Sequence, residues 1–374
     1  MSDIADLGKG TGISKDQLSD NGTSCILYGE LYTKYKSEII TDVISKTNID
    51  NTKLVRSKAN DVIIPCSGET AEDIATARCV LKDDILLGGD LNIIRLHSHD
   101  GSFMSYQLNG KRKYDIARVA QGVSVVHLYG EHLKDVKTHN PSLDEQRKIA
   151  KLLSLLDERI VTQNKIIDKL QSLIKGINQN VFTSIGVNYK LGELCEIRSG
   201  YSGNQLTSKK GLRVSRIETI SGHMINMERV GYVEPFESSD SYRLQIGDIL
   251  FSNINSVEYI GNTAFIDKDY DLYHGMNLLR LMPNQNLVMP FYLYLLLNEN
   301  KMLNYFKTIC NKAVSQASIN QTELGKTIIN LPNLEKQKEV CVTYQAIYSK
   351  LDVEKQTLSL YKKQKQYLLR QMFI

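Results

Sequence analysis

The sequence predicts an α+β protein: two duplicated modules of mixed α and β structure, joined by two long helices packed as an antiparallel coiled coil with pseudo-two-fold symmetry. Three observations predict this fold class. The second half of the chain repeats the first, two tracts carry an apolar heptad pattern, and each tract directly follows one copy of the repeated module. A repeat of this period is a duplication of domain size rather than a solenoid.

The repeat is clearest where each module ends. Residues 122–146 align with residues 313–337 at a shift of 191, which places Pro141 on Pro332 and Gln146 on Gln337. The same shift places Val123-Ser124 on Val314-Ser315. Weaker matches precede these in the same order: Leu7-Gly8 with Leu191-Gly192, residues 61–64 with 248–251, residues 92–96 with 277–281, and Phe103 with Phe291. Their offsets differ by a few residues, as insertions in surface loops produce.

The order of segments is therefore module, helix, module, helix. We expect a first module over residues 1–141, a first helix over 142–185, a second module over 186–332 and a second helix over 333–374. Within the second module, the alternating stretches 229–233 and 248–252 are typical of strands, and residues 289–309 are typical of a helix.

The two helical tracts begin with capping residues and continue as heptad seams. Ser142 with Glu145 three residues later forms a capping-box pattern, and Asn333 or Glu335 would start the second helix. The expected seam residues are Ile149, Leu153, Leu156, Ile160, Ile167, Leu170 and Ile174 in the first helix, and Val340, Tyr344, Ile347, Leu351, Leu358, Tyr361 and Leu368 in the second. Gln163, Glu354 and Lys365 occupy polar seam positions.

Helices of this length span about 55 Å and cannot bury a seam alone, so the two seams should pack on each other. An antiparallel arrangement is the simplest one because a module separates the two helices in sequence. The alternative is a helix pair inside one compact core, but the length and outer charge of these tracts disfavour it. A two-helix seam also leaves faces for partner helices.

Composition excludes several classes of protein. The chain has 374 residues, 42% hydrophobic and 24% charged, as in globular proteins. We expect a cytoplasmic protein, because the sequence shows neither an apolar run of membrane-spanning length nor a signal-peptide pattern at its start. The six cysteines form no CxxC pair, and the histidines lack zinc-ligand spacing, so no metal site is expected.

No sequence motif points to catalysis. Gly325-Lys326-Thr327 suggests a phosphate-binding loop, but the glycine required five residues earlier is Asn320. Metalloprotease, serine-hydrolase and amino-methyltransferase motifs are absent from the sequence. We therefore expect a non-catalytic chain without a cofactor of its own, and a fused nuclease or methylase is a remote alternative.

The helical tracts resemble those of a known family. Residues 141–160 (PSLDEQRKIAKLLSLLDERI) and 175–182 are similar to the start and end of the conserved helical region of Type I restriction-modification DNA specificity subunits. Residues 332–373 resemble the second such region, and residues 8–18 and 26–35 resemble one class of target-recognition domain. The resemblance covers nearly the entire chain, and the duplicated pair of helical regions makes it specific.

The resemblance implies a function. Each module would be a target-recognition domain that reads one half of a bipartite, asymmetric site in double-stranded DNA, and the helices would set the spacing between halves. The helices would also dock two modification subunits, which methylate adenine with S-adenosylmethionine, and restriction subunits driven by ATP and Mg would join them. The competing interpretation is a coiled-coil scaffold whose two modules bind protein or carbohydrate.

Candidate DNA contacts are basic and amide residues on predicted loops. Phosphate contacts are expected from Lys9, Lys15, Lys34, Lys36, Arg56, Lys58, Lys111, Arg112 and Lys113 in the first module, interleaved with Tyr32 and Tyr35, and from Lys209, Lys210, Arg213, Arg216, Lys307 and Lys312 in the second. Base contacts are expected from Asn204, Gln205, Asn253, Asn255 and Gln316. The alternative for each is a solvated surface residue, and the run 111–113 is the strongest candidate.

Overall fold

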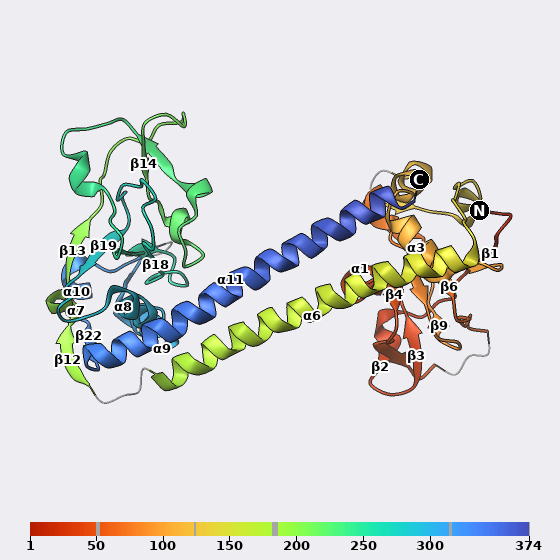
Figure 1. Ribbon diagram of the computed structural model, residues 1–374, viewed down its shortest axis with the longest axis horizontal. Coiled ribbons are helices and arrows are strands. Elements are labelled where there is room, and N and C mark those ends of the chain that lie inside the picture. Colours follow the sequence, from red (N-terminus) through yellow and green to blue (C-terminus); the bar gives the residue numbers. More distant parts are fainter. Residues whose placement is uncertain (50–52, 123–124, 182–185, 314–315, 374) are drawn as a thin grey trace. The chain divides into compact units, whose positions relative to one another are not determined.

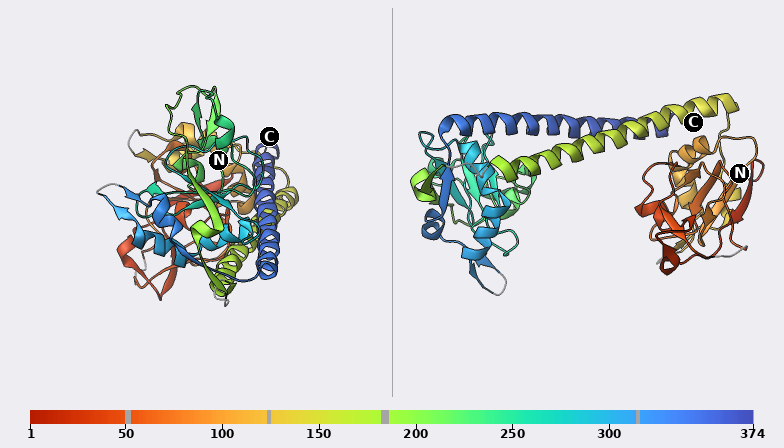
Figure 2. Two further views of the ribbon diagram at one scale, coloured as in Figure 1. Left: turned by 90° about the vertical axis from the view of Figure 1, so that its left-hand side faces the viewer. Right: turned by 90° about the horizontal axis from the view of Figure 1, so that it is seen from below.

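The computed structural model describes residues 1–49, 53–122, 125–181, 186–313 and 316–373 (Figure 1). The chain forms two compact units. Unit 1 comprises Met1–Asp168 and Val353–Ile374, and unit 2 comprises Lys169–Asp352. Both termini of the chain belong to unit 1 (Figure 2). Each long helix, α6 (Leu143–Val181) and α11 (Leu334–Gln371), contributes residues to both units.

Unit 1 contains two main sheets. The first has the strand order β1 (Ala5–Lys9), β10 (Leu91–Leu96), β6 (Asp61–Pro65), β8 (Arg78–Val80) and β4 (Ile39–Ile40), and the second has the order β2 (Leu18–Ser19), β5 (Ser45–Thr47), β3 (Thr23–Ile26) and β9 (Leu86–Leu87). Strands β7 (Ser67–Gly68) and β11 (Val126–His127) pair separately. The helices are η1 (Lys15–Gln17), α1 (Glu30–Thr33), α2 (Ala71–Ile74), α3 (Gly101–Asn109), α4 (Lys113–Val119) and α5 (Gly130–Lys134).

The central strand β6 of unit 1 is buried on both faces. Val62 and Ile64 pack into one hydrophobic cluster, and Ile63 packs into another. Because alternate side chains of a strand point to opposite faces, a run without polar alternation is what a doubly covered strand requires.

Unit 2 has a four-stranded main sheet in the order β13 (Cys195–Ser199), β19 (Leu279–Pro283), β16 (Ile249–Phe251) and β18 (Thr263–Phe265). The smaller sheets pair β12 (Val187–Lys190) with β22 (Ile328–Leu331), β14 (Leu212–Val214) with β15 (Gly231–Val233), and β17 (Ile254–Asn255) with β21 (Ala317–Ser318) and β20 (Asn311–Lys312). The helices are α7 (Leu191–Leu194), η2 (Ile217–Ile220), η3 (Met227–Arg229), η4 (Ser239–Tyr242), α8 (Pro290–Leu297), α9 (Asn300–Ile309) and α10 (Gln321–Gly325).

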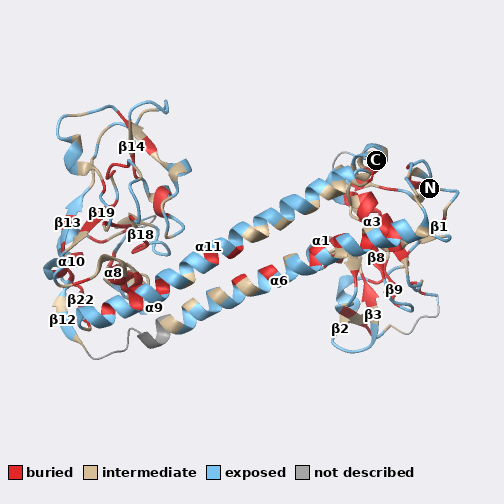
Figure 3. Cartoon of the chain, viewed as in Figure 1, coloured by how far each residue is buried: buried red, intermediate tan, exposed pale blue. Residues whose placement is uncertain are grey.

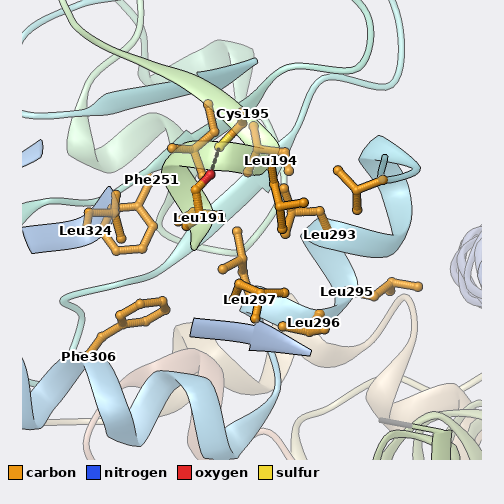
Figure 4. Packing of buried hydrophobic residues seen from close by; sticks show 14 of the residues in the cluster. Leu191, Leu194, Cys195, Phe251, Leu293, Leu295, Leu296, Leu297, Phe306 and Leu324 are labelled. Carbon is orange, nitrogen blue, oxygen red and sulfur yellow. Dashed lines mark hydrogen bonds between the residues drawn. The ribbon is translucent and has the colours of Figure 1, made fainter. Parts of the chain in front are cut away.

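The main core of unit 2 lies between its sheet and α8. Phe251 of β16, Leu293 of α8 and Phe306 of α9 converge there (Figure 4). The expected helix over 289–309 is broken at Asn298, whose side chain donates to the Tyr294 carbonyl oxygen and ends α8. The stretch 229–233 is a strand only from Gly231 onward, because Arg229 is the last residue of η3 and Val230 caps it.

The duplication is visible in hydrogen bonds. Asp61 accepts from the backbone N–H of Lys58 at 2.8 Å, and Asp248 accepts from that of Gln245 at 2.6 Å. Each aspartate also pairs with an arginine of the neighbouring strand at 2.7 Å, Arg95 in unit 1 and Arg280 in unit 2. The residue before each aspartate has a positive φ, 81° at Asn60 and 98° at Gly247. The match of residues 61–64 with 248–251 is therefore confirmed.

One of the weaker sequence matches is wrong. Leu7-Gly8 lies in strand β1, whereas Leu191-Gly192 lies in the helical turn α7. In the structure the equivalent positions are Gly10 and Gly200, because each comes directly after the first strand of its main sheet and lies against another backbone. A Cβ at Gly10 would lie 2.0 Å from the Gly88 carbonyl oxygen, and one at Gly200 would lie 1.8 Å from that of Gly275. Only glycine allows two backbones to approach this closely. The match of Val123-Ser124 with Val314-Ser315 lies outside the described residues.

Both long helices have the expected start. Ser142 precedes α6, and Glu145 accepts from its backbone N–H at 3.2 Å and from its hydroxyl at 2.8 Å. The expected capping box is thus half formed, since the serine hydroxyl donates instead of accepting. For α11 the structure selects Asn333, whose side chain accepts from the backbone N–H of Lys336 at 2.9 Å.

The predicted packing of the two long helices on each other is confirmed, while part of the burial of the expected seam residues comes from the modules, as for Val340 and Tyr344 in the core of unit 2. All fourteen expected seam residues are buried or half-buried, and exposed residues cover the outer surfaces of both helices (Figure 3). In unit 1 the side chain of Gln163 donates to Glu354, while Lys365 pairs with Asp157. Asp157 of α6 contacts residue 365 of α11, and Gln163, further along α6, contacts residue 354. The residue numbers therefore run in opposite directions along the two helices, and the pairing is antiparallel. Gln163 and Glu354 are also equivalent under the shift of 191, as a local pseudo-two-fold axis between them requires.

A glutamine near the start of each helix fastens it to its module. Gln146 accepts from the backbone N–H of Asp100 at 2.9 Å and donates to the Pro141 carbonyl oxygen at 2.8 Å. Gln337 accepts from the N–H of Met289 at 2.9 Å and donates to the Pro332 carbonyl oxygen at 2.9 Å. Asp100 and Met289 precede the equivalent helices α3 and α8. Buried backbone groups need such partners, which explains why both copies carry glutamine here.

Replacing Gln146 with methionine should lower the free energy of unfolding by about 2–4 kcal/mol, because each buried backbone group left without a partner costs about 1–3 kcal/mol. Gln337→Met should have an effect of similar size. Urea denaturation followed by circular dichroism measures both. Gln171→Met, an exposed change on α6, is the control and should have little effect. Equal stabilities of Q146M and Q171M would contradict the expected role of the buried glutamine.

Candidate nucleic-acid interface

Each unit carries a β-hairpin attached just beyond its central strand. In the first hairpin the backbones of Gln121 and His127 are joined by two hydrogen bonds, at 2.9 and 2.7 Å, and residues 122, 125 and 126 are the described residues between them. Its strand β11 pairs with β7, which follows β6. The second hairpin consists of the paired strands β20 and β21, and β21 also pairs with β17, which follows β16. Equivalent bonds attach them, from the Leu128 N–H to the Cys66 carbonyl oxygen and from the Ile319 N–H to that of Asn253. The two hairpins are therefore copies of one structural element.

The second hairpin brings together four of the residues expected to contact DNA. Asn255 in β17 and Lys312 in β20 both lie opposite Ala317 of β21. Gln316 and Lys312 are exposed, and Asn253 lies at the base of the hairpin. The side-chain oxygen of Asn253 is buried without a hydrogen-bond partner among the described residues. This group offers amide donors and acceptors beside a cation, which suits contact with base edges and phosphate.

A second group of expected residues surrounds strand β15 of unit 2. A Cβ added at Gly231 would lie 2.8 Å from the side-chain oxygen of Gln205 and 3.0 Å from Cδ of Arg216, and Arg213 lies opposite Tyr232. Both arginines already have acidic partners: Arg213 pairs with Asp271 at 2.6 Å and Arg216 with Glu218 at 3.5 Å. A phosphate would have to compete with these carboxylates. Asn204, Lys209 and Lys210 are exposed in the segment before β14, and Lys307 is half-buried in α9.

The expected phosphate contacts of unit 1 are dispersed over several elements. Lys15 and Lys58 are exposed. Four others have partners within the unit: Lys9 with Asp90, Lys34 with Glu30 and Ser45, Lys36 with the Tyr32 carbonyl oxygen, and Arg56 with that of Asp84. Tyr35 is a core residue rather than a surface one, since it packs among buried apolar side chains and burial raises its pKa to about 12. It therefore cannot interleave with the surface charge as expected.

The run Lys111-Arg112-Lys113 lies at the turn between α3 and α4, next to the last turns of α11. A Cβ added at the preceding Gly110 would lie 2.6 Å from the Leu369 carbonyl oxygen. Arg112 pairs with Asp115 at 3.4 Å, and Lys111 is exposed. The exposed Lys111 is therefore the member of this run with the most freedom to meet a phosphate.

The first hairpin carries polar residues that the sequence interpretation missed. The Ser67 hydroxyl lies 3.4 Å from Nδ1 of His127, whose ring stacks on that of Tyr129 with 6.1 Å between centroids. Tyr129 is 52% exposed. The repeat could have identified this region, because the shift of 191 places Gln121 on Lys312. The missing information was that this stretch forms a hairpin.

A groove of about 580 Å³ adjoins the first hairpin. It is lined by Tyr28, Gly29, Tyr32, Thr33, Ser67, Gly68, Glu69, Asp73 and Val125. The Tyr32 hydroxyl donates to the Ser67 carbonyl oxygen at 3.1 Å, and burial raises its pKa, so it stays protonated at neutral pH. The groove therefore combines aromatic faces with two carboxylates.

Among the residues that the structure describes, no group of three or more His, Cys, Asp or Glu side chains could hold a metal ion. The six cysteines are buried and unpaired with one another. Burial raises the pKa of the Cys25 and Cys66 thiols to about 11. Within the same described ranges, no helix is long and apolar enough to cross a membrane.

Solved structures define the class of protein to which this fold belongs. The S subunit of a Type I restriction-modification system from M. genitalium superposes with a TM-score of 0.64 over 100% of this chain and 94% of that one, at 17% identity. A second solved structure, described as the basis of complex assembly and conformational transition of the Type I R-M system, superposes with a TM-score of 0.59. The superposition covers 98% of this chain and 94% of that one, also at 17% identity. The fold is that of Type I specificity subunits.

Sequence comparison identifies the family. The family model described as "Type I restriction modification DNA specificity domain" matches residues 1–172 and again 187–360, and the chain belongs to this family. A putative Type I restriction enzyme MjaX specificity subunit from Methanocaldococcus jannaschii is 42% identical over 180 residues, 47% of this chain and 42% of that protein. The MjaVIII specificity subunit from the same organism is 24% identical over 372 residues, 91% of this chain and 84% of that protein. The match therefore spans less than half of the first relative and most of the second.

Proposed function

We propose that this chain reads a bipartite, asymmetric site in double-stranded DNA, with one half-site contacted by each module. The duplicated hairpin supports this proposal most directly, because a repeated element on a repeated domain is what two separate half-sites require. The hairpins carry different side chains: Gln121, Ser67 and His127 at the first, and Lys312, Asn255 and Gln316 at the second. Different donors and acceptors select different bases, so the two half-sites should differ.

The groove beside the first hairpin suits exposed amino groups. Carboxylates accept hydrogen bonds from cytosine N4 or adenine N6 in the major groove. Glu69 and Asp73 lie in that lining next to the aromatic rings of Tyr28 and Tyr32. The second hairpin has amides and a lysine instead, and asparagine and glutamine pair well with adenine.

The chain itself is proposed to be non-catalytic and to act within a complex. Its helix pair would dock two modification subunits that methylate adenine with S-adenosylmethionine, and restriction subunits using ATP and Mg would complete the assembly. Outward faces of α6 and α11 remain available for such docking, since the seam occupies only one face of each helix.

Methylation mapping tests this function. In the native host, deleting this chain should abolish adenine methylation at one bipartite motif and leave other methylation unchanged. A binding assay with the purified chain and its modification subunit should show preference for duplexes that contain both halves of that motif. A chain that binds carbohydrate or protein, with a methylome unchanged by its deletion, would instead support the scaffold alternative.

Base-reading and phosphate-contacting residues should respond differently to substitution. Gln316→Ala should lower affinity by about 1–3 kcal/mol for the native half-site and relax the base preference at one position. Lys111→Glu with Lys113→Glu should weaken binding to all sequences and flatten the salt dependence. Fluorescence anisotropy with half-site variants at several salt concentrations measures both effects. An unchanged salt slope in the second variant would count against a phosphate contact there.

A further inference from the structure

The two helices differ on the faces that point away from the seam. In α11, Val353, Leu360 and Tyr367 recur every seven residues and are 54%, 64% and 64% exposed. Seven-residue spacing keeps them on one face of the helix, which is the pattern of a second seam. All three belong to unit 1. Unit 1 also exposes Leu152 and Leu155 of α6, at 49% and 42%.

The duplicated positions do not repeat this apolar character. Under the shift of 191, the three α11 residues correspond to Thr162, Lys169 and Gly176 of α6. Leu152 and Leu155 correspond to Thr343 and Ala346 of α11. All five counterparts are exposed and either polar or small.

Unit 2 has exposed apolar residues of its own at other positions of the helices. Leu173 of α6 corresponds to Gln364, and Val342 of α11 corresponds to Lys151. The helix surfaces of the two units therefore differ in pattern as well as in apolar extent. A partner present in two identical copies cannot make the same contacts with both.

The helix segment that carries the exposed apolar residues of unit 1 is also more basic than the equivalent segment of the other helix. Residues 355–371 of α11 contain no acidic residue and expose four basic ones, Lys355, Lys362, Lys363 and Arg370. Lys365 does not add to this surface charge, because it is paired with Glu38 and Asp157. The corresponding stretch of α6, residues 164–180, contains Lys165, Lys169 and Lys175 together with Asp168. The apolar stripe of unit 1 thus lies on the more basic helix segment, which favours an acidic amphipathic helix as its partner. Two α11 segments from different chains would repel each other, so a second copy of this chain fits the stripe poorly.

We propose that the helix surface of unit 1 is a high-affinity docking site for an acidic amphipathic helix of the modification subunit, and that the surface of unit 2 binds the second copy more weakly. This inference rests on the proposed function, in which two modification subunits dock on the helix pair. The complex with one modification subunit then accumulates before the complex with two. This order of binding is expected because unit 1 exposes apolar residues on its helices, whereas the equivalent positions of the other helix are polar or small.

A titration of the full chain with its modification subunit, followed by native mass spectrometry, tests the inequality. Two identical independent sites give stepwise constants that differ by about fourfold, from statistics alone. We expect a ratio of at least about fortyfold, because burying one more leucine-sized side chain already changes affinity by about tenfold or more. A ratio near fourfold would overturn the inference.

Matched variants assign the tighter step to unit 1. Leu360→Glu should weaken the first binding step by about tenfold or more, whereas Lys169→Glu, at the equivalent position of α6, should leave that step unchanged. Lys169→Leu should strengthen the binding of the second modification subunit and so reduce the ratio of the two stepwise binding constants. Both positions are exposed, so circular dichroism should show an unchanged melting temperature in each variant.

The outcomes separate the two proposals. If both modification subunits bind equally well and L360E has no effect, the unequal docking is wrong while the proposed function stands. If no modification subunit binds and methylation does not depend on the chain, the proposed function fails and the docking inference fails with it. Self-association of the chain that L360E abolishes would identify a second copy as the occupant and overturn the inference.

Discussion

Replacing Lys365 with methionine should lower the free energy of unfolding by about 3–5 kcal/mol, because it leaves two buried carboxylates without their cation. The Lys365 ammonium lies between Glu38 and Asp157, and the three side chains are only 14%, 9% and 11% exposed. Tyr106 donates its hydroxyl to Asp157 at 2.7 Å. This cluster joins the first module to α6 and α11 within unit 1, so its loss should loosen that joint.

Denaturant unfolding at neutral pH measures this effect. Lys363→Met removes a lysine of the same helix that is exposed, and serves as the control. Surface charges contribute little, so this control should unfold within about 0.5 kcal/mol of the parent protein. Equal losses for the two variants would show that the buried cluster adds no stability.

The loss caused by Lys365→Met should depend on pH. Burial raises the pKa of Glu38 above its ordinary value, while Lys365 and Arg78 lower it and Asp157 raises it. A carboxyl whose pKa is raised by folding favours the folded state below its unfolded pKa, and this stability is lost as pH rises through the folded pKa. Without Lys365 the Glu38 pKa rises further. The stability gap between parent and K365M should therefore be largest at neutral pH and shrink in mild acid; a gap that widens in acid would contradict this account.

If each module reads one half-site, as we propose, lengthening both helices by one heptad should change the spacing between the half-sites and leave the recognised bases unchanged. Seven residues inserted between Ile160 and Val161, and seven between Thr357 and Leu358, keep the phase of both seams. The pair Gln163 and Glu354 stays together because the two insertions lie on the same side of it. Seven helical residues add about 10.5 Å, so the spacing should grow by up to about three base pairs.

Methylation mapping with the lengthened chain in place of the native one gives the result directly. Insertion of five residues at the same two sites is the control, since it rotates the following seam by about 140° and should abolish folding of the helix pair. If the lengthened chain read altered half-sites at unchanged spacing, the helices would not set the distance between the halves. Retained function with the five-residue insertion would show that seam phase is unimportant.

The long helices and their pairing could be predicted from the sequence alone. A heptad of apolar residues sustained over both tracts specifies a seam whatever surrounds it, because only another apolar face can cover it. The shift of 191 also anticipated that Gln163 and Glu354 are equivalent, and the structure shows them hydrogen-bonded. The sequence pattern was sufficient to predict this pairing because the contacts repeat at a regular interval along each helix.

The surfaces proposed to contact DNA could not be predicted in this way. The sequence indicated basic residues, yet Arg213 and Lys34 turned out to be paired with acidic neighbours, and Tyr35 is in the core. The first hairpin was missed because Ser67 and His127, which it joins, lie 60 residues apart in sequence. Exposure and pairing depend on which strands become neighbours, and the residue type does not encode this.

The sequence by itself determined the duplication, the two helices and their antiparallel seam, because apolar periodicity is a local property of the chain. Only the tertiary structure decided how each copy is joined to the helices. In unit 1 the joint is the ionic cluster of Lys365, Glu38 and Asp157, whereas in unit 2 the counterpart of Asp157 is Tyr348, which packs against Phe291 and Tyr344. The sequence shows that the two positions carry different residues, but not what each residue contacts. Those contacts depend on which side chains of the module pack against the helix, and only the folded chain decides this.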